Sequence, residues 1–374
     1  MSVADARLVV ERAIAARVFP AAAFEVGLSD GFFTSEVLGT VSFDDGAEPT
    51  SRDTVFDLAS LTKPVATTSI AMDLVSRGAL TLDARIADFF DEWRGGDREA
   101  VMVRDLLEHA SGLPARLVDQ PPATRREFEH DICTFALEYE PRTRSLYSDL
   151  GFILLGFLLE RLGQASLAEL FERMTRSDAI SRQPSRDPVG GPAPENPFSF
   201  EVDAVLTFGL HPDERRWAAP TLPMDDDARR GRVLRGEVHD NYAAALGGVA
   251  GHAGLFGTAN GVSTFARALL RALRGDPDAP PPFSAGLLRD FLSTSTVPSS
   301  SRALGWDTML PTSSCGTRMS ASAFGHVGYT GTSLWIDPDR DRYVVLLTNR
   351  VNGAGTLDDM RTVRRAFHDA LGDV

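Results

Sequence analysis

One serine and one lysine lie three positions apart in the stretch FDLASLTKPVATTSIAMDLVSRGAL, residues 56 to 80, and they suggest nucleophilic chemistry. Lys63 is the only lysine in a chain that holds 38 lysine and arginine residues. Positions three apart share one face of a helix, so a helix here would bring the amine close to the Ser60 hydroxyl. A serine hydroxyl needs a base to take its proton, and lysine can act as one when burial and neighbouring cations lower its pKa. Arginine stays protonated. The pattern therefore predicts Ser60 as nucleophile and Lys63 as its base.

The residues around this pair predict a helix that begins near Ser60 and ends near Gly78. Pro64 fits only in the first turn of such a helix, which places Ser60 at its N-terminal end. The unpaired amides and the dipole at that end favour the negative charge that develops on an attacked carbonyl oxygen. The alternative interpretation of Ser-x-x-Lys alone is a serine N-cap followed by a surface lysine.

Several motifs resemble the serine β-lactamase and penicillin-binding-protein superfamily, whose signature begins with Ser-x-x-Lys. They are FDLASLTK, VRDLLEHASGLP, YSDLGFILLG, LGGVAGHAGLFGTA and GHVGYTGTSLWIDP, and they extend over nearly the whole chain. The sequence looks most like the β-lactamase-related branch, which includes AmpC-type enzymes, DD-peptidases and carboxylesterases. This resemblance implies a serine hydrolase that works without a cofactor or a metal.

The second motif of that superfamily would be Tyr147-Ser148-Asp149, where AmpC-type enzymes have Tyr-x-Asn. A phenol near a cationic lysine can share or exchange its proton, so Tyr147 is a candidate general base or proton shuttle. Asp149 departs from the pattern because it brings a charge where an amide would contact substrate, and it could instead hold Lys63 in place. The alternative is a tyrosine at a helix start, with Ser148 or Asp149 as N-cap of a helix over 150–162.

The third motif would be His326-Val327-Gly328, where the family has Lys-Thr-Gly, at the edge of a strand. Gly328 permits close approach of substrate, and the amide of Tyr329 would be an oxyanion donor beside that of Ser60. We assign His326 to substrate binding, with structural turn packing as the alternative. Loss of the family's lysine and threonine removes groups that bind a carboxylate. We therefore expect a neutral ester or amide rather than a β-lactam or a D-Ala terminus.

The remaining histidines fit no metal spacing. His252, in the Gly-rich loop at 246–259, could face the pocket or simply pack in a turn, and this loop has no Gly-Lys-Ser/Thr ending for phosphate. We interpret His109 as part of a helix C-cap, and His211 and the pair His239-Asp240 as solvated surface.

Strand patterns occur at both ends of the chain and helical patterns between them. AAFEVGL and FFTSEVLGTVSF flank Ser29-Asp30-Gly31 as a hairpin, and TSLWIDP and DRYVVLLTNR form a second pair before a helix over 357–371. An amphipathic helix with Leu8, Val9, Ile14 and Val18 on its apolar face precedes them. LGFILLGFLLERLG should be a helix buried almost all round.

We predict an α+β fold in which one antiparallel β-sheet is built from both chain termini, is flanked by helices and carries a mainly helical insertion, as in the β-lactamase/transpeptidase fold. The predicted division is a sheet domain of residues 1–80 and 250–374, and a mostly helical domain of residues 81–249 with long loops, including one at 181–197.

The composition is typical of a soluble globular protein, with 43% hydrophobic and 24% charged residues in 374. The net charge of −14 argues against nucleic acid or an anionic membrane as partner. Cys133 and Cys315 lie in no redox or metal spacing, so we expect buried thiols. The N-terminal stretch does not look like a signal peptide. We expect a cytoplasmic location, or a periplasmic one if a leader precedes the sequence.

Three classes of function remain open. A serine hydrolase would form an acyl-enzyme on a small ester, a D-amino-acid peptide or a β-lactam, and we expect short-chain p-nitrophenyl esters to be turned over faster than nitrocefin. A silent penicillin-binding-like protein would keep the scaffold without the chemistry. A transacylase would pass the acyl group to an alcohol. The sequence sets neither the oligomeric state nor the role of residues 181–240.

Overall fold

The computed structural model of the chain describes residues 1–117, 121–176 and 204–372. The predicted loop at 181–197 lies outside these residues. The helices and strands, in chain order, are α1 Val3–Ala15, β1 Ala21–Gly27, β2 Phe33–Gly39, β3 Phe56–Asp57, α2 Ser69–Ser76, α3 Val103–Leu107, α4 Arg125–Thr134, α5 Asp149–Gly163, α6 Leu167–Arg176, β4 Leu206–Phe208, α7 Asn241–Ala245, β5 Leu255–Gly257, α8 Ala259–Leu273, α9 Ala285–Leu292, β6 Asp307–Thr308, β7 Phe324–Val327, β8 Ser333–Asp337, β9 Arg342–Thr348 and α10 Leu357–Leu371.

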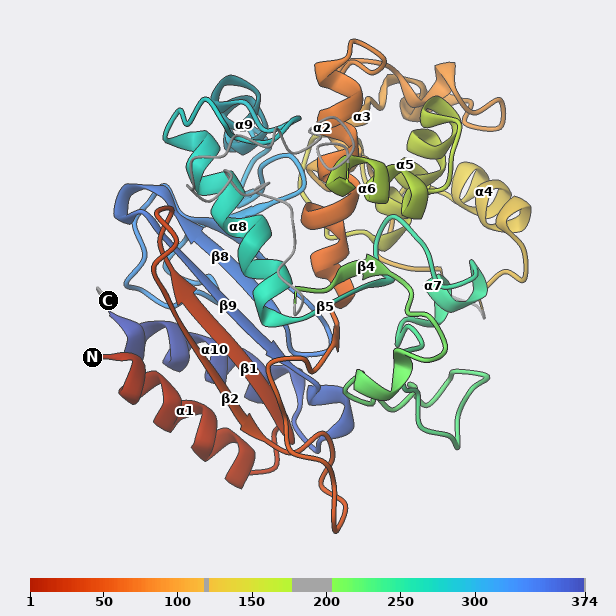
Figure 1. Cartoon of the computed structure of the whole chain (residues 1–374). Coiled ribbons are helices and arrows are strands. Elements are labelled where there is room, and N and C mark those ends of the chain that lie inside the picture. Colours follow the sequence, from red (N-terminus) through yellow and green to blue (C-terminus); the bar gives the residue numbers. More distant parts are fainter. Residues whose placement is uncertain (118–120, 177–203, 373–374) are drawn as a thin grey trace, which may run out of the picture.

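A six-stranded antiparallel sheet joins the two ends of the chain, in the order β2-β1-β9-β8-β7-β6 (Figure 1). The N-terminal hairpin pairs with the C-terminal strand β9 along most of β1, for example Phe24 with Leu346. The termini themselves meet where the Ser2 amide donates to the Ala370 carbonyl, 3.0 Å away. The predicted α+β fold, with a sheet built from both termini, is confirmed.

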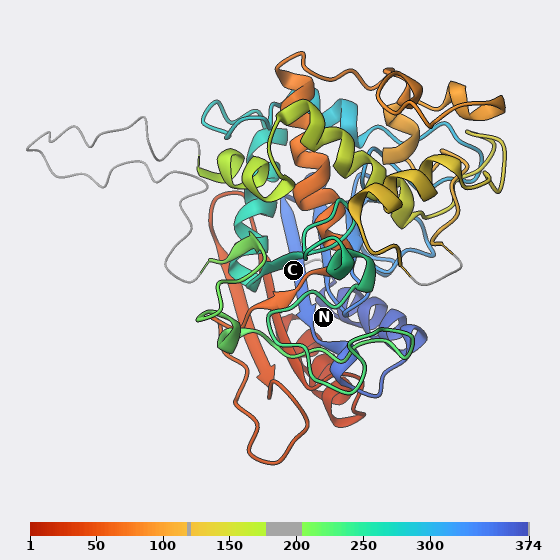
Figure 2. The same cartoon turned by 90° about the vertical axis from the view of Figure 1, so that its right-hand side faces the viewer.

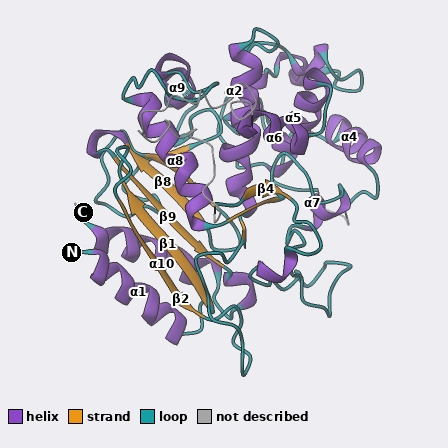
Figure 3. Cartoon of the chain, viewed as in Figure 1, coloured by secondary structure: helices purple, strands orange, loops and turns teal. Residues whose placement is uncertain are grey.

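Helices cover both faces of this sheet, as Figure 3 shows by colour. Side chains alternate along β1. Ala22 and Phe24 belong to a core formed with α1 and α10, whereas Ala21 and Ala23 belong to the larger core on the opposite face. That larger core includes residues of α8, which packs on β1 and β9. The central strands of the sheet, β1, β8 and β9, are therefore buried on both faces.

The helices from α2 to α6 gather at one end of the molecule, opposite α1 and α10 (Figures 1 and 2). α5 lies in their middle, and every residue from Leu150 to Leu159 is buried, as its apolar sequence predicts. Its N-cap is Ser148, whose Oγ accepts from the Gly151 amide at 3.2 Å. The larger core runs from these helices to the sheet without interruption, and the division into two domains stays a prediction.

The predicted apolar face of the first helix is wrong in part. Leu8 is 46% exposed, and the residues of α1 that are buried are Ala6, Val10 and Ala13. Val9 and Ile14 do pack against the core that contains α10, and Val18 is buried in it, so the error concerns Leu8. The small alanines let α1 approach α10 closely.

Cys133 and Cys315 are buried free thiols, as expected. Among the described residues, no single helix has the length and apolarity needed to cross a membrane. Within the part of the chain that the structure describes, one bent pair satisfies both criteria together: Asp149–Gly163 and Leu167–Thr175, at 67° to each other.

Gly251 is where the loop before β5 touches α5, and it offers a test of this packing. A Cβ at this position would overlap the Phe152 carbonyl oxygen of α5. We expect Gly251→Ala to lower the free energy of unfolding by about 1–3 kcal/mol, measured by urea denaturation, because neither backbone can yield freely. Gly286→Ala is the matched control, since nothing lies within 4 Å of its added methyl and alanine suits the helix α9. Equal stabilities of the two variants would contradict this close approach.

Candidate active site

Ser60 lies on a tight turn that follows strand β3. A 3-10 turn, Ala59–Leu61, begins directly after the strand, and Ala59 has a φ of 47°, which is rare for a residue with a Cβ. The Asp57 carboxylate holds this conformation by accepting from the Ala59 amide at 2.8 Å and from the His239 amide at 2.6 Å. Ser60 is therefore presented by a backbone that its neighbours fix in an unusual conformation.

Lys63 begins a π-helical segment, Lys63–Thr68, that continues into α2. Wide turns of this kind are uncommon and often occur at functional sites. The side chain is completely buried. Its amine contacts three acceptors: Ser60 Oγ at 3.1 Å, Asp149 Oδ1 at 2.7 Å and the His252 carbonyl at 3.2 Å. An ammonium has three hydrogens to donate, so these contacts saturate the protonated form.

The expected lowering of the Lys63 pKa is wrong for this structure. Burial is the largest single effect and disfavours the ammonium, but Asp149 and Tyr147 together oppose it and leave the pKa of Lys63 raised. Burial likewise disfavours the Asp149 carboxylate, but Lys63, His252 and Arg116 together lower the pKa of that carboxyl group. The two groups form an ion pair inside the protein, and Lys63 must lose a proton before it can accept one.

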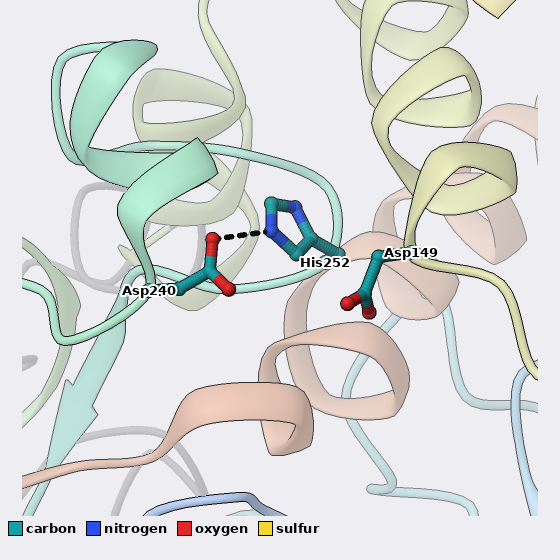
Figure 4. Close-up of side chains that lie close together, drawn as sticks. All are labelled: Asp149, Asp240 and His252. Atoms are coloured by element: carbon teal, nitrogen blue, oxygen red, sulfur yellow. Dashed lines mark hydrogen bonds and ion pairs between the residues drawn. The ribbon is translucent and has the colours of Figure 1, made fainter. Parts of the chain in front are cut away.

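Asp149 belongs to a wider network of charges that the sequence did not reveal. Its other oxygen accepts from Arg116 Nη1 at 3.0 Å, and the same nitrogen donates to Asp240 at 2.9 Å. Asp240 in turn bonds His252 Nε2 at 2.8 Å (Figure 4). Burial disfavours the Asp240 carboxylate, yet His252 and Arg116 hold its pKa well below the usual value.

Asp149, Asp240 and His252 place one oxygen or nitrogen each within 4.8 Å of one another, which is close enough to surround a metal ion. However, Arg116 already bonds both carboxylates, and Lys63 bonds one of them. These two cations supply the positive charge that a metal would bring, so the arrangement needs no metal for charge balance.

Tyr147 precedes the N-cap of α5, and its ring lies 4.8 Å from the Lys63 nitrogen. The ring also packs against His109, with centroids 4.6 Å apart. Burial raises the pKa of Tyr147, although the Lys63 charge opposes this effect. His109 follows α3 with a φ of 55°, as a C-cap residue does, and its Nδ1 accepts from the Ser148 amide at 3.0 Å. The predicted cap therefore also supports the motif at 147–149.

His326 lies on β7, with its ring centroid 5.9 Å from that of Tyr147. Burial, together with the charges of Arg302 and Lys63, holds the pKa of His326 well below its usual value, so the ring is neutral. Nδ1 is 2.9 Å from the Val327 carbonyl, which can only accept, and this contact assigns the proton to Nδ1. Nε2 is then a bare acceptor, and it is buried without a partner among the described residues. The third motif thus holds an acceptor where the family has a cation.

Gly328 is packed directly against the Ser60 turn. A Cβ there would collide with Thr332 Oγ1 and lie 2.6 Å from the Leu58 carbonyl oxygen. Thr332 also donates to that carbonyl oxygen, and Thr330 donates to the Asp57 carbonyl at 2.7 Å. These contacts bring the turn after β7 beside the turn that carries Ser60.

The oxyanion role of the Tyr329 amide stays a prediction. The Tyr329 side chain is 43% exposed and stacks on His239.

One interpretation of the histidines needs correction. His239 and Asp240 are not solvated surface: His239 is 3% exposed and Asp240 is the carboxylate at the centre of the charge network. His252 does lie at the site, but it contributes its carbonyl to Lys63 and its ring to Asp240. Its role in binding substrate stays a prediction. Sequence reasoning missed Arg116 and Arg302. The carboxylate of Asp149, in place of the family's amide, was the one signal that a cation such as Arg116 should lie nearby.

The model of the Beta-lactamase family matches residues 7–368. The chain belongs to this family. A protein of Escherichia coli (strain K12), named "Putative D-alanyl-D-alanine carboxypeptidase", is 30% identical over 327 residues, which cover 79% of this chain and 69% of that protein. An N-acetylmuramyl-L-alanine amidase of Bacillus subtilis (strain 168) is 28% identical over 372 residues, covering 91% of this chain and 79% of the relative.

Solved structures of this Beta-lactamase-family fold align along almost the entire chain. EstCE1, a hydrolase with promiscuous acyltransferase activity, superposes with a TM-score of 0.73 at 18% identity, covering 99% of this chain and 98% of its own. A class C β-lactamase from Rhodobacter sphaeroides superposes with a TM-score of 0.70 at 19% identity, covering 98% of both chains. The family and the relatives make this chain a serine hydrolase of the β-lactamase and penicillin-binding-protein type.

The charge of Asp149 should control the pH at which the site becomes active. In Asp149→Asn, burial of Lys63 is no longer opposed by a bonded carboxylate, so the pKa of Lys63 should fall. We expect the alkaline rise of kcat/KM to move to lower pH by about 1–3 units, the size of shift that a neighbouring opposite charge produces. The measurement is a pH–rate profile with a p-nitrophenyl ester. Asp91→Asn, at a fully exposed carboxylate, is the control and should keep the wild-type profile. An unchanged profile in Asp149→Asn would contradict the assigned ion pair.

Proposed function

We propose that this protein hydrolyses an ester or amide carbonyl through an acyl-enzyme on Ser60. The observation that carries the proposal is the contact of 3.1 Å between Ser60 Oγ and the buried Lys63 amine. Ser60 Oγ would bond to the carbonyl carbon, and the leaving alcohol or amine would depart with a proton. Water would then cleave the acyl–serine ester and release the acid.

Proton transfer in this reaction is assigned to Lys63 and Tyr147 together. Lys63 carries its full set of protons in the resting site, and Tyr147 holds its own because burial raises its pKa. The pair can therefore accept the Ser60 proton only after either Lys63 or Tyr147 has lost one proton. Because the amine and the phenol interact closely, the pKa of this deprotonation is a property of the pair and not of one residue. Asp149, in this scheme, orients Lys63 and sets its charge.

The proposed substrate class is a small ester rather than a β-lactam. Position 326 holds a neutral ring and position 327 a valine, so the groups with which the family's third motif binds a carboxylate are missing. A penicillin-binding-like protein without chemistry is the alternative. It is disfavoured because nucleophile, amine and phenol all lie together around one turn.

Substitution of the two central residues tests the mechanism. We expect Ser60→Ala to lower kcat/KM for p-nitrophenyl acetate by at least about 10³-fold, because the variant lacks the oxygen to which the acyl group would bond. Lys63→Arg keeps the charge but cannot give up its proton, and should lower kcat/KM by about 10²–10⁴-fold.

Assays with nitrocefin and a D-Ala-D-Ala peptide, run in parallel, test the substrate class, and the wild-type protein should turn over the ester fastest. Efficient nitrocefin turnover with inert esters would reverse the substrate assignment.

Covalent labelling distinguishes the hydrolase from a silent binding protein. A fluorophosphonate should add to Ser60 in the folded protein, because the neighbouring amine and phenol activate that hydroxyl. Intact-mass spectrometry followed by peptide mapping measures the adduct. Ser111, a buried serine beside His109, is the internal control and should stay unmodified. A folded protein that forms no adduct at Ser60 would favour the silent class.

A further inference from the structure

The turn between β7 and β8, residues 328–332, is closed by its own backbone. The Gly328 amide donates to the Thr332 carbonyl at 2.8 Å, and the Gly331 amide donates to the Gly328 carbonyl at 3.1 Å. The amide of Tyr329, by contrast, donates to no residue that the structure describes. The Tyr329 N–H is therefore available to a molecule bound at the site.

Arg364 of α10 binds the carbonyl groups of the same turn. Its Nη2 donates to the Gly328 carbonyl at 2.6 Å and to the Thr332 carbonyl at 2.8 Å. The C=O and N–H of a planar trans peptide point in opposite directions. Because the Gly328 carbonyl faces Arg364, the N–H of the same peptide unit, which is that of Tyr329, points away from this guanidinium.

A second arginine fixes the peptide unit on the other side of the Tyr329 Cα. Arg350 donates to the Tyr329 carbonyl from Nη2 at 2.8 Å and from Nε at 3.1 Å. The two carbonyls that flank this Cα are thus each held by a guanidinium. The Tyr329 amide cannot rotate without breaking a bond to one of the two cations.

The charge of Arg364 is buried without a carboxylate partner among the described residues. The side chain is 6% exposed, and its Nε has no hydrogen-bond partner there. Burial, together with the charges of Arg350 and Arg361, lowers the pKa of Arg364 to about 9, which leaves it charged at neutral pH. An unpaired buried charge is costly, and two carbonyls could be held by a neutral donor. This cost indicates a role for the charge itself.

A cation at a carbonyl oxygen draws electrons through the peptide bond and makes its N–H a stronger donor. Linked hydrogen bonds polarise one another in this way, most strongly where water is excluded. When Ser60 Oγ bonds to an acyl carbon, an electron pair of the C=O bond moves to its oxygen, which becomes negative. A polarised donor stabilises that oxygen more than it stabilises the neutral carbonyl of the substrate.

We propose that Arg364 is a positioning residue that aims and polarises the Tyr329 amide for the negative oxygen formed during acylation of Ser60. The proposal rests on the acyl-enzyme function given above and deepens it. It assigns to α10 a residue that acts on the reaction through one peptide bond, without contact with the substrate.

Three substitutions at position 364 separate the charge from the hydrogen bonds. We expect Arg364→Met to lower kcat/KM for p-nitrophenyl acetate on the order of 10–100-fold, which is less than the loss of a whole oxyanion donor because the Tyr329 amide remains. Arg364→Lys keeps a cation and should regain part of this loss. Arg364→Gln keeps a donor without the charge and should not. Arg361→Met, at an exposed arginine of α10, is the matched control and should keep wild-type activity.

Inhibition by phenylboronic acid is a readout that a merely structural role would not move in the same way. Its boron bonds to the serine oxygen as a tetrahedral anion that resembles the reaction intermediate. We expect its inhibition constant in Arg364→Met and Arg364→Gln to rise by about the factor by which kcat/KM falls, while KM for the ester changes less than about 3-fold. A distorted turn would weaken binding of the neutral ester as well.

The outcomes separate the two proposals. Wild-type activity in all three variants, equal recovery by Arg364→Lys and Arg364→Gln, or an unchanged boronate constant overturns the Arg364 proposal alone. Full activity in Ser60→Ala overturns the acyl-enzyme and the Arg364 proposal with it. Circular dichroism and thermal unfolding verify that each variant is folded. If Arg364→Met does not fold, the comparison of Arg364→Lys with Arg364→Gln decides, because both keep a donor at this position.

Discussion

A buried ammonium with three acceptors organises this site. Lys63 lies at the start of a π-helical segment, and its acceptors come from three other places in the chain: the Ser60 turn, the first residue of α5 and the loop before β5. A buried charge is tolerated only when its hydrogen bonds are complete, so the amine binds these segments to one another. The same bonds that stabilise the charge also place it against the Ser60 hydroxyl.

The carboxylate of Asp149 connects Lys63 to a second set of charged residues. A carboxylate where related enzymes have an amide adds a negative charge to the interior, and that charge has to be balanced. Lys63 balances it on one side and Arg116 on the other, and Arg116 also joins Asp240. Asp240 fixes His252, whose carbonyl returns to Lys63. The network closes on itself, so its members respond together to a change of protonation.

The other half of the site has little charge of its own. Tyr147 lies among the rings of His109 and His326, which burial keeps neutral. His326 offers an acceptor where the superfamily has a lysine, and the cation on this side is Arg302, from a segment about two dozen positions earlier in the sequence. The two halves of the site thus differ in charge: one holds a closed network of ion pairs, and the other holds neutral rings beside Arg302.

The sequence determined the local features. Alternating and helical periodicities gave the terminal hairpins, α10 and the buried α5, and the three-residue spacing gave the contact between Ser60 and Lys63, because these depend on neighbours in the chain. It could not give the raised pKa of Lys63, the burial of His239, or the contacts of Asp240 with Arg116 and His252. Each of those depends on which distant segments the fold brings together: the partner of a charge decides its pKa and its freedom, and no local pattern records that partner.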